Sequence, residues 1–318
     1  MLKMRSSVEK TPDDSSVVTY ISSEKIWRGV VRRFLRNKTA LISLIIFLVI
    51  CLACALAPFL TPWGYGTINS ANIRATPSIM HILGTDGLGR DIFTRLLFGG
   101  RVTLRVALLS TALALIIGGV LGLFAGYFGG HIDLVIFPIL DILASIPIIL
   151  LVVVVEAVFG FGNGYFMYAM IIAAIPQFAR IARASAMNIA GCDYIEAARA
   201  LGVGHITTLF RHVLHNITSP LIVRFARGVA EAILICTILG YLGIGTRPPM
   251  PEWGGIIHGA YSSIRTHPHI MIVSCAVVTI CIVSVHLFSE GLREALNPRE
   301  KRARSRRSAV RKKAGIRA

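Results

Sequence analysis

Residues 193–214 read Asp-Tyr-Ile-Glu-Ala-Ala-Arg-Ala-Leu-Gly-Val-Gly-His-Ile-Thr-Thr-Leu-Phe-Arg-His-Val-Leu, a polar stretch between long apolar runs. Asp193 followed three residues later by Glu196 predicts a capping box, in which each side chain accepts from the other residue's backbone N–H. Gly202 predicts the end of this helix, because glycine adopts a positive φ without strain. A second, amphipathic helix is expected after Gly204, with an apolar stripe formed by Ile206, Leu209, Phe210, Val213 and Leu214. The whole stretch is therefore expected to form a compact docking element.

The rest of the chain is strongly apolar. Of its 318 residues, 54% are hydrophobic and only 15% are charged, whereas about a quarter of the residues in soluble domains are charged. Because a helix of about 20 apolar residues crosses the hydrocarbon core, we expect an all-α membrane protein with six transmembrane helices. The expected spans are residues 40–60, 102–126, 134–159, 165–179, 219–241 and 270–288.

Basic residues gather at the two ends and around the polar stretch. Twenty-four of the 33 Lys and Arg residues lie in residues 1–40, 176–220 and 289–318. Since positive charge marks the cytoplasmic side, both termini and the polar stretch are expected in the cytoplasm. The expected order is a basic cytoplasmic segment (1–39), a first transmembrane helix (40–60), an extracytoplasmic loop (61–101), a membrane core (102–290) and a basic cytoplasmic tail (291–318). The net charge of +17 could suggest nucleic acid, but basic residues at these positions are expected to bind anionic lipid headgroups instead.

No pattern in the sequence predicts a catalytic or metal site. There is no nucleophile–base pair at a recognisable spacing, and the glycines of residues 84–89 are not followed by the Lys-Ser/Thr of a phosphate-binding loop. Cys51 and Cys54 have a metal-like spacing, but they lie in an apolar run without histidine and are interpreted as small apolar side chains of a helix. We expect no catalytic residue, no metal and no bound cofactor.

Six charged residues fall inside the expected spans: Arg105 and Arg224, and the four candidates for a functional role, Asp141, Glu156, Arg227 and Glu231. A charge in the membrane is costly, and such residues usually face the interior of a helix bundle and have a partner. Arg227 and Glu231 are spaced i, i+4 and are expected to pair. Two interpretations remain open: these residues line a substrate path, or they lock contacts between helices or with a partner subunit.

Three motifs occur together. Glu196-Ala197-Ala198 followed by Gly202 and Leu214 resembles the EAA loop of the membrane subunits of ABC importers, although His215 stands where proline is usual. The runs Gly-Thr-Asp-Gly-Leu-Gly-Arg-Asp (84–91) and Pro-Pro-Met-Pro-Glu-Trp-Gly (248–254) resemble signatures of the dipeptide/oligopeptide permeases of the C type. The resemblance covers about residues 25–298.

This resemblance implies a type I ABC importer (MetI-like) permease fold in a bacterial inner membrane, with the coupling loop at residues 190–215. It implies a transport subunit and not an enzyme, since ATP is bound by partner subunits. The implied partners are a second permease, two ATPase subunits, an extracytoplasmic solute-binding protein and membrane lipids. Coupling to the ATPase is implied for Asp193, Glu196, Ala197, Ala198, Leu201 and Gly202.

Di- or oligopeptides are the expected substrates of such a permease. Nickel, glutathione and opines are alternatives within the same family. An ion-coupled secondary transporter is the competing class, but it would predict inverted repeats, and the sequence has no visible repeat.

Overall fold

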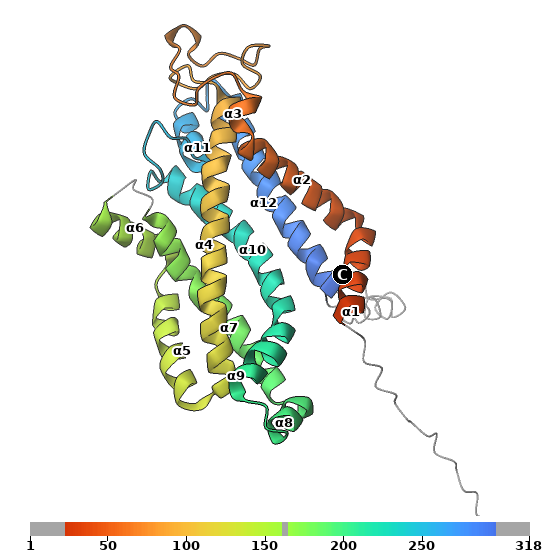
Figure 1. The fold of residues 1–318 in the computed structure, drawn as a ribbon. Coiled ribbons are helices and arrows are strands. Elements are labelled where there is room, and N and C mark those ends of the chain that lie inside the picture. The colour runs from red at the N-terminus through yellow and green to blue at the C-terminus, as the bar shows by residue number, and fades with distance from the viewer. Residues whose placement is uncertain (1–22, 161–164, 297–318) are drawn as a thin grey trace, which may run out of the picture.

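The computed structural model describes residues 23–160 and 165–296, which form a long bundle of helices (Figure 1). Within these residues there is no β-strand, only an isolated bridge between Thr85 and Asp91. The elements in chain order are α1 (Ser23–Arg36), α2 (Lys38–Ala55), α3 (Ala57–Leu60), η1 (Ser70–Asn72), α4 (Ile92–Phe128), α5 (Gly130–Ser145), α6 (Ile148–Phe159), α7 (Phe166–Ala190), α8 (Asp193–Ala200), α9 (His205–Thr207), the π-helix η2 (Thr208–Val213), α10 (Leu214–Tyr241), α11 (Trp253–Tyr261) and α12 (Pro268–Leu296).

Helix α4 runs through the whole bundle and organises its neighbours (Figure 1). Its first residue is Ile92, so the expected loop 61–101 ends ten residues early, because the Asp91 side chain caps the helix by accepting from the backbone N–H of Thr94 at 2.7 Å. Farther along, Gly118, Gly122 and Gly126 let α4 approach α7 so closely that a Cβ on any of them would collide with the backbone or side chains of α7.

Three helices are long and apolar enough to cross a membrane: α2, α4 and α12. Helices α5 and α6 add a fourth span only if they are taken together, since they bend by 87° at the break before Pro147. The span expected at residues 134–159 is therefore two helices in the structure. By length and composition, the described residues thus supply three or four of the six expected crossings.

The expected fourth and fifth spans are longer than the sequence pattern suggested. Helix α7 continues past Pro176 to Ala190, and α10 begins at Leu214 and includes Pro220. Both are long enough to cross a membrane, but neither is apolar enough to be counted with α2, α4 and α12 as a candidate span. Their polar ends therefore extend the bundle toward α8.

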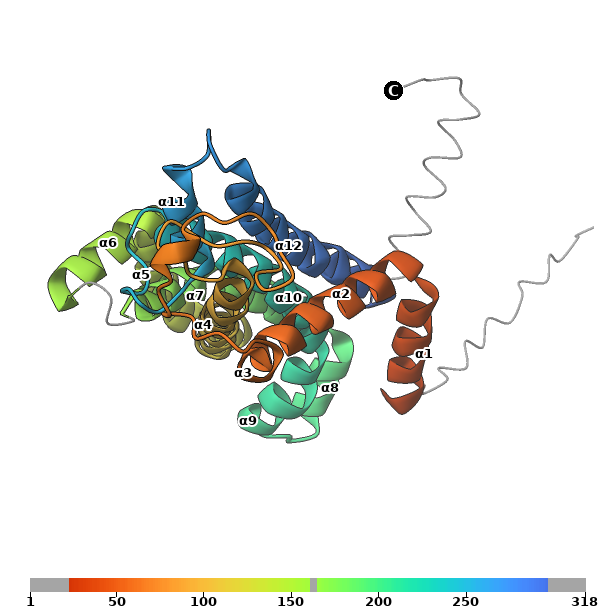
Figure 2. The same ribbon diagram turned by 90° about the horizontal axis from the view of Figure 1, so that it is seen from above.

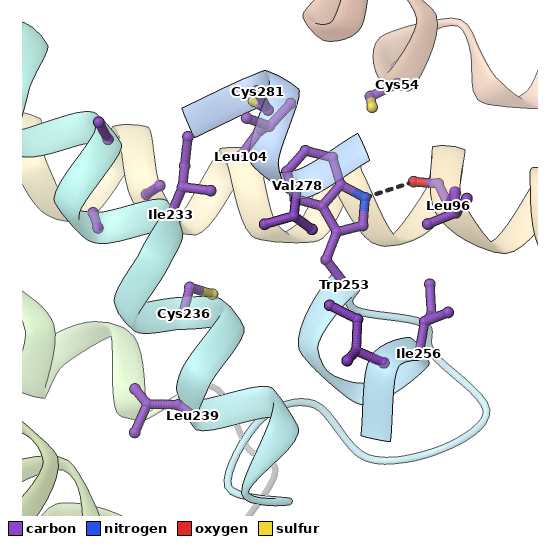
Figure 3. Packing of buried hydrophobic residues seen from close by; sticks show 14 of the residues in the cluster. Cys54, Leu96, Leu104, Ile233, Cys236, Leu239, Trp253, Ile256, Val278 and Cys281 are labelled. Carbon is purple, nitrogen blue, oxygen red and sulfur yellow. Dashed lines mark hydrogen bonds between the residues drawn. The ribbon is translucent and has the colours of Figure 1, made fainter. Parts of the chain in front are cut away.

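The largest hydrophobic cluster is centred on the fully buried Trp253 at the start of α11 (Figure 3). Its indole Nε1 donates to the Leu96 carbonyl of α4 at 2.9 Å. Cys54 of α2 and Val278 of α12 belong to the same cluster. Gly100 leaves the space that the indole occupies, because a Cβ there would lie 2.7 Å from Trp253 Cζ2. One aromatic side chain thus ties four helices together.

Residues 61–91 and 242–267 gather at the same end of the bundle, and we call them the cap (Figure 1). Buried Asp91 lies 2.9 Å from His81, measured from Oδ1 to Nδ1. Asp86 accepts from Arg90 Nε at 2.8 Å and lies 3.4 Å from Arg95 Nε. The glycine-rich run of residues 84–91 is therefore folded into a polar network over the first turn of α4.

Helix α1 lies at the edge of the bundle, where it packs against α2 and α12 and away from the central helices (Figure 2). Its Phe34 packs edge-on against Phe288 of α12, with ring centroids 5.8 Å apart. Asn37, which caps α2, also donates to Glu294 at 3.3 Å.

Candidate functional site

The polar stretch lies at the end of the bundle opposite the cap (Figure 1). Helix α8 begins at Asp193, and its N-cap is Cys192, whose carbonyl accepts from Ile195 and Glu196 at 2.9 and 3.3 Å. The predicted capping box is wrong, because the helix starts one residue earlier than the pattern suggested and no side chain caps it. Asp193 and Glu196 instead stand in the first turn, where the helix dipole favours negative charge.

The end of α8 follows the prediction. Gly202 has φ +82°, the left-handed conformation that glycine adopts without strain. Its N–H donates to the Arg199 carbonyl at 2.9 Å, and the Val203 N–H donates to the Ala198 carbonyl at 3.1 Å. This pair of bonds is a Schellman motif, which satisfies the last carbonyls of the helix.

The second helix differs from the expected stripe. Residues 205–241 are helical without interruption, but Thr208–Val213 form a π-helix. Within this segment, Leu209 and Val213 form the buried face. Ile206 and Phe210 are displaced from that face and remain 58% and 47% exposed.

One buried side chain anchors α8 to the bundle. Ile195 is fully buried in a cluster with Leu209, Val213 and Tyr127 of α4. Around it, the Arg199 guanidinium lies 4.8 Å from the centre of the Tyr127 ring, and the Tyr127 hydroxyl lies 3.2 Å from Nδ1 of His205. Ile195 was not among the predicted site residues, although an isolated isoleucine in a polar helix is a visible signal in the sequence.

The residues predicted to couple to an ATPase lie together on the outside of this anchored element. Leu201 is 86% exposed, and Ala198 is partly buried. The remaining predicted coupling residues, which are also exposed, are Asp193, Glu196, Ala197 and Gly202. The element therefore offers a surface that mixes acidic, small and apolar side chains to a partner.

The structure separates the two carboxylates of the third expected span. Glu156 is fully buried and accepts from the backbone N–H of Phe166 at 2.7 Å, which fixes the start of α7. Asp141 is exposed and accepts from Arg180 at 2.7 Å. Asp133, directly before the span expected at residues 134–159, forms an ion pair with Arg183.

The predicted Arg227–Glu231 pair is wrong. Arg224 donates to both oxygens of Glu231, at 2.9 and 2.8 Å. Residues seven apart lie on nearly the same helix face, and arginine is long enough to reach along two turns. Arg224 also donates to Gln177 of α7, while Arg227 is exposed.

Glu252 of the cap is a buried carboxylate that the sequence analysis did not single out. Its oxygens accept from the Thr246 N–H at 2.9 Å and from the Cys236 thiol at 3.2 Å. Burial raises the pKa of Glu252 above its ordinary value, and these two hydrogen bonds oppose that rise only in part. Gly240 and Gly245 leave room for the carboxylate.

Metal-ligating residues are dispersed. In the part of the chain that the structure describes, no group of three or more His, Cys, Asp or Glu residues could hold a metal ion. Cys51 and Cys54 lie in α2 as free thiols.

Two family descriptions match the chain. "Binding-protein-dependent transport system inner membrane component" matches residues 118–302, and "N-terminal TM domain of oligopeptide transport permease C" matches residues 25–77.

Curated relatives cover most of the chain. A glutathione transport system permease protein of Pectobacterium atrosepticum is 36% identical over 86% of this chain and 92% of its own length. A dipeptide transport system permease protein of Alkalihalophilus pseudofirmus is 36% identical over 86% and 90%. A dipeptide transport system permease protein of Haemophilus influenzae is 32% identical over 84% and 93%.

The fold also has solved counterparts. Two inward-facing structures of the MetNI methionine ABC transporter contain a chain with TM-scores of 0.52 and 0.54, at 19% identity. Each match covers 64% of this chain and 96% of the solved one. The ATPase of such transporters is a separate subunit, so this chain is a transport subunit and not an enzyme. The chain belongs to the binding-protein-dependent transport system inner membrane components, as a multi-pass permease subunit of an ABC importer of the oligopeptide permease C type.

Proposed function

We propose that the chain forms half of the translocation path of an importer for di- or oligopeptides. The names of its relatives support this substrate class, because they specify dipeptides and glutathione, which is itself a short peptide. They favour peptides over nickel or opines. No cofactor is assigned to the chain, since ATP would be bound by partner subunits.

The proposed complex contains a second permease, two ATPase subunits and an extracytoplasmic solute-binding protein. In this arrangement the chain crosses the membrane six times, with α7 and α10 as the fourth and fifth crossings and with both termini in the cytoplasm. The clustering of basic residues in 1–40, 176–220 and 289–318 supports this orientation. Charged side chains on α7 and α10 would then face protein or water rather than lipid.

Residues 190–215 are the proposed docking site for an ATPase subunit. The exposure of large apolar side chains on an anchored element carries this proposal: Leu201 is 86% exposed, Ile206 58% and Phe210 47%. An apolar surface of this kind marks a site of contact with another protein. Ala197 and Ala198 would allow close approach, and the Gly202 turn would present Leu201 to the partner.

The anchoring of α8 suggests how movement would be transmitted. Ile195 joins α8 to Leu209 and Val213 next to α10, and Tyr127 joins it to α4. When the ATPase subunits close on ATP, a push on α8 would therefore reach both long helices. The path would then alternate between its outward-facing and inward-facing forms.

Replacing Leu201 with aspartate tests the docking site. In cells that contain all partner subunits, we expect Leu201→Asp to lower dipeptide uptake at least about tenfold, because loss of a central apolar contact commonly costs more than about 2 kcal/mol. The amount of chain in the membrane should not change. Leu242→Asp is the matched control, since Leu242 is 52% exposed in the cap. Normal uptake by Leu201→Asp would contradict the proposed docking site.

A further inference from the structure

A groove of about 470 Å³ lies between α7, α10 and the end of α12. This volume lies in the range of about 300–1,000 Å³ that is typical of small-molecule sites. Its polar lining consists of Ser219, Arg224, Arg227 and Arg293. A smaller hollow of about 40 Å³, lined in part by Gln177 and Glu231, shares Arg224 with the groove. Arg224 thus stands between a basic groove and a carboxylate.

The position of Arg227 shows that this face of α10 does not meet lipid. Arg227 is in the middle of α10 (Leu214–Tyr241), is exposed, and makes no ion pair among the described residues. A charge at this depth requires water or protein around it. On α2, by contrast, exposed side chains such as Ile45 and Leu52 are apolar, as expected of a lipid-facing surface.

The Arg224–Glu231 pair leaves the carboxylate partly open. The side chain of Arg224 is only 10% exposed, while that of Glu231 is 40% exposed. Arg224 is held by Gln177 and lies 5.5 Å from the centre of the Phe178 ring. A carboxylate has about four lone-pair sites, and Arg224 uses two of them. Glu231 can therefore accept from a second cation without losing Arg224.

Arg227 and Glu231 present opposite charges at a spacing that suits a short peptide. Four residues rise about 6 Å along a helix, and the two termini of an extended dipeptide are about 7 Å apart. Guanidinium groups bind carboxylates through paired hydrogen bonds, and a carboxylate binds an ammonium group in the same charge-assisted way.

We propose that the Arg227–Glu231 face of α10 binds both termini of a peptide during its passage through the permease. Arg227 binds the α-carboxylate, and Glu231 binds the α-ammonium group. Arg224 and Gln177 are positioning residues that hold the Glu231 carboxylate in the small hollow next to the groove. This inference rests on the proposed function, because it takes the substrate to be a peptide.

Blocked peptides separate the two binding roles. The complete transporter, reconstituted in vesicles with its binding protein, is supplied at saturating concentration with a free dipeptide, its N-acetyl form or its C-terminal amide. Since each variant uses the same binding protein, differences between variants report on the permease. We expect Glu231→Gln to lower import of the free and amidated forms about tenfold, as loss of a charge-assisted hydrogen bond does, and to leave the N-acetyl form unaffected.

Arg227→Gln should show the mirror-image pattern, with about tenfold losses for the free and N-acetyl forms and none for the amide. Arg227→Lys and Glu231→Asp keep the charges and should preserve discrimination. Arg180→Gln, which removes another exposed arginine, is the matched control and should leave all three rates unchanged.

The outcomes distinguish this inference from the proposed function. Equal losses for all three peptides would show a merely structural role and would overturn the binding site, as would unchanged import in both neutral variants. If the wild-type transporter imports none of the peptides, the proposed substrate class fails. Peptide import by the wild type without terminus-specific effects in the variants removes only the inference.

Discussion

The two ends of the bundle are built by opposite principles. In the cap, polar groups are buried and paired: Asp91 with His81, and Glu252 with Thr246. In the 190–215 segment, large apolar side chains such as Leu201 are exposed, and Gly202 and Gly204 have open space around them. The cap is joined to α2, α4 and α12 through Trp253, whereas α8 depends mainly on Ile195.

This difference separates residues that hold the fold from residues that are available to a partner. Buried paired groups lose much of their stabilisation when one member is removed. Exposed side chains change stability little when replaced. Mutations of buried groups in the cap should therefore lower the stability of the isolated chain, and mutations in the 190–215 segment should mainly affect transport.

The largest effect is expected for Trp253→Ala. Removing a fully buried tryptophan leaves a cavity between α4, α11 and α12 and also leaves the Leu96 carbonyl without its donor. Such changes cost about 3–5 kcal/mol, so the melting temperature in detergent should fall sharply and little chain should accumulate in the membrane. Phe59→Ala, at a side chain that is 85% exposed, is the control. A stable Trp253→Ala protein would break the comparison.

An intermediate effect that depends on pH is expected for Glu252. Its pKa in the folded chain is raised above 4.5 by burial, so the folded chain retains a proton that the unfolded chain releases. The protonated Glu252 therefore contributes its full stabilisation below about pH 4.5. This stabilisation is lost as the pH rises through the pKa of Glu252 in the folded chain, and it amounts to about 1.4 kcal/mol for each unit by which burial raises that pKa.

The melting temperatures of the wild type and of Glu252→Gln are measured at about five pH values between about pH 4 and pH 8, the range in which the proton on Glu252 affects stability. Relative to the wild type, the glutamine variant should gain stability as the pH rises. Glu196→Gln, at an exposed carboxylate of the 190–215 segment, is the control. A difference between the wild type and Glu252→Gln that is independent of pH would contradict the role assigned to burial.

Local signals in the sequence predicted local structure well. Gly202 ended α8 because only one residue type readily takes its φ of +82°. The runs 84–91 and 248–254 both matched the family motifs, but only the structure shows that they lie in the same cap. Features that depend on the conformation of a single residue, such as the end of α8, could be predicted from the sequence.

Interactions between distant residues could not be predicted in this way. The i, i+4 rule assigned Glu231 to Arg227, but Gln177 of α7 and the ring of Phe178 hold Arg224 in place for the same carboxylate. Glu156 and Asp141 look alike in sequence, yet one fixes α7 and the other is exposed. The π-helix at Thr208–Val213 redistributed an apolar stripe that α-helical spacing would have kept together.

The smallest effect on stability, with a large effect on transport, is expected at Gly202. A valine forced into a positive φ costs about 1–3 kcal/mol locally, but the turn is exposed and has no neighbour within 4 Å that must move. The end of α8 would therefore rearrange and redirect Leu201 while the bundle remains folded. We expect Gly202→Val to stay in the membrane with nearly wild-type melting temperature and to lose dipeptide uptake.

Gly204→Ala is a matched control, because Gly204 also has open space but an ordinary φ of −60°, and it should transport normally. Normal uptake by Gly202→Val would mean that the orientation of Leu201 does not matter, and the contrast between the two ends of the bundle would then no longer explain coupling.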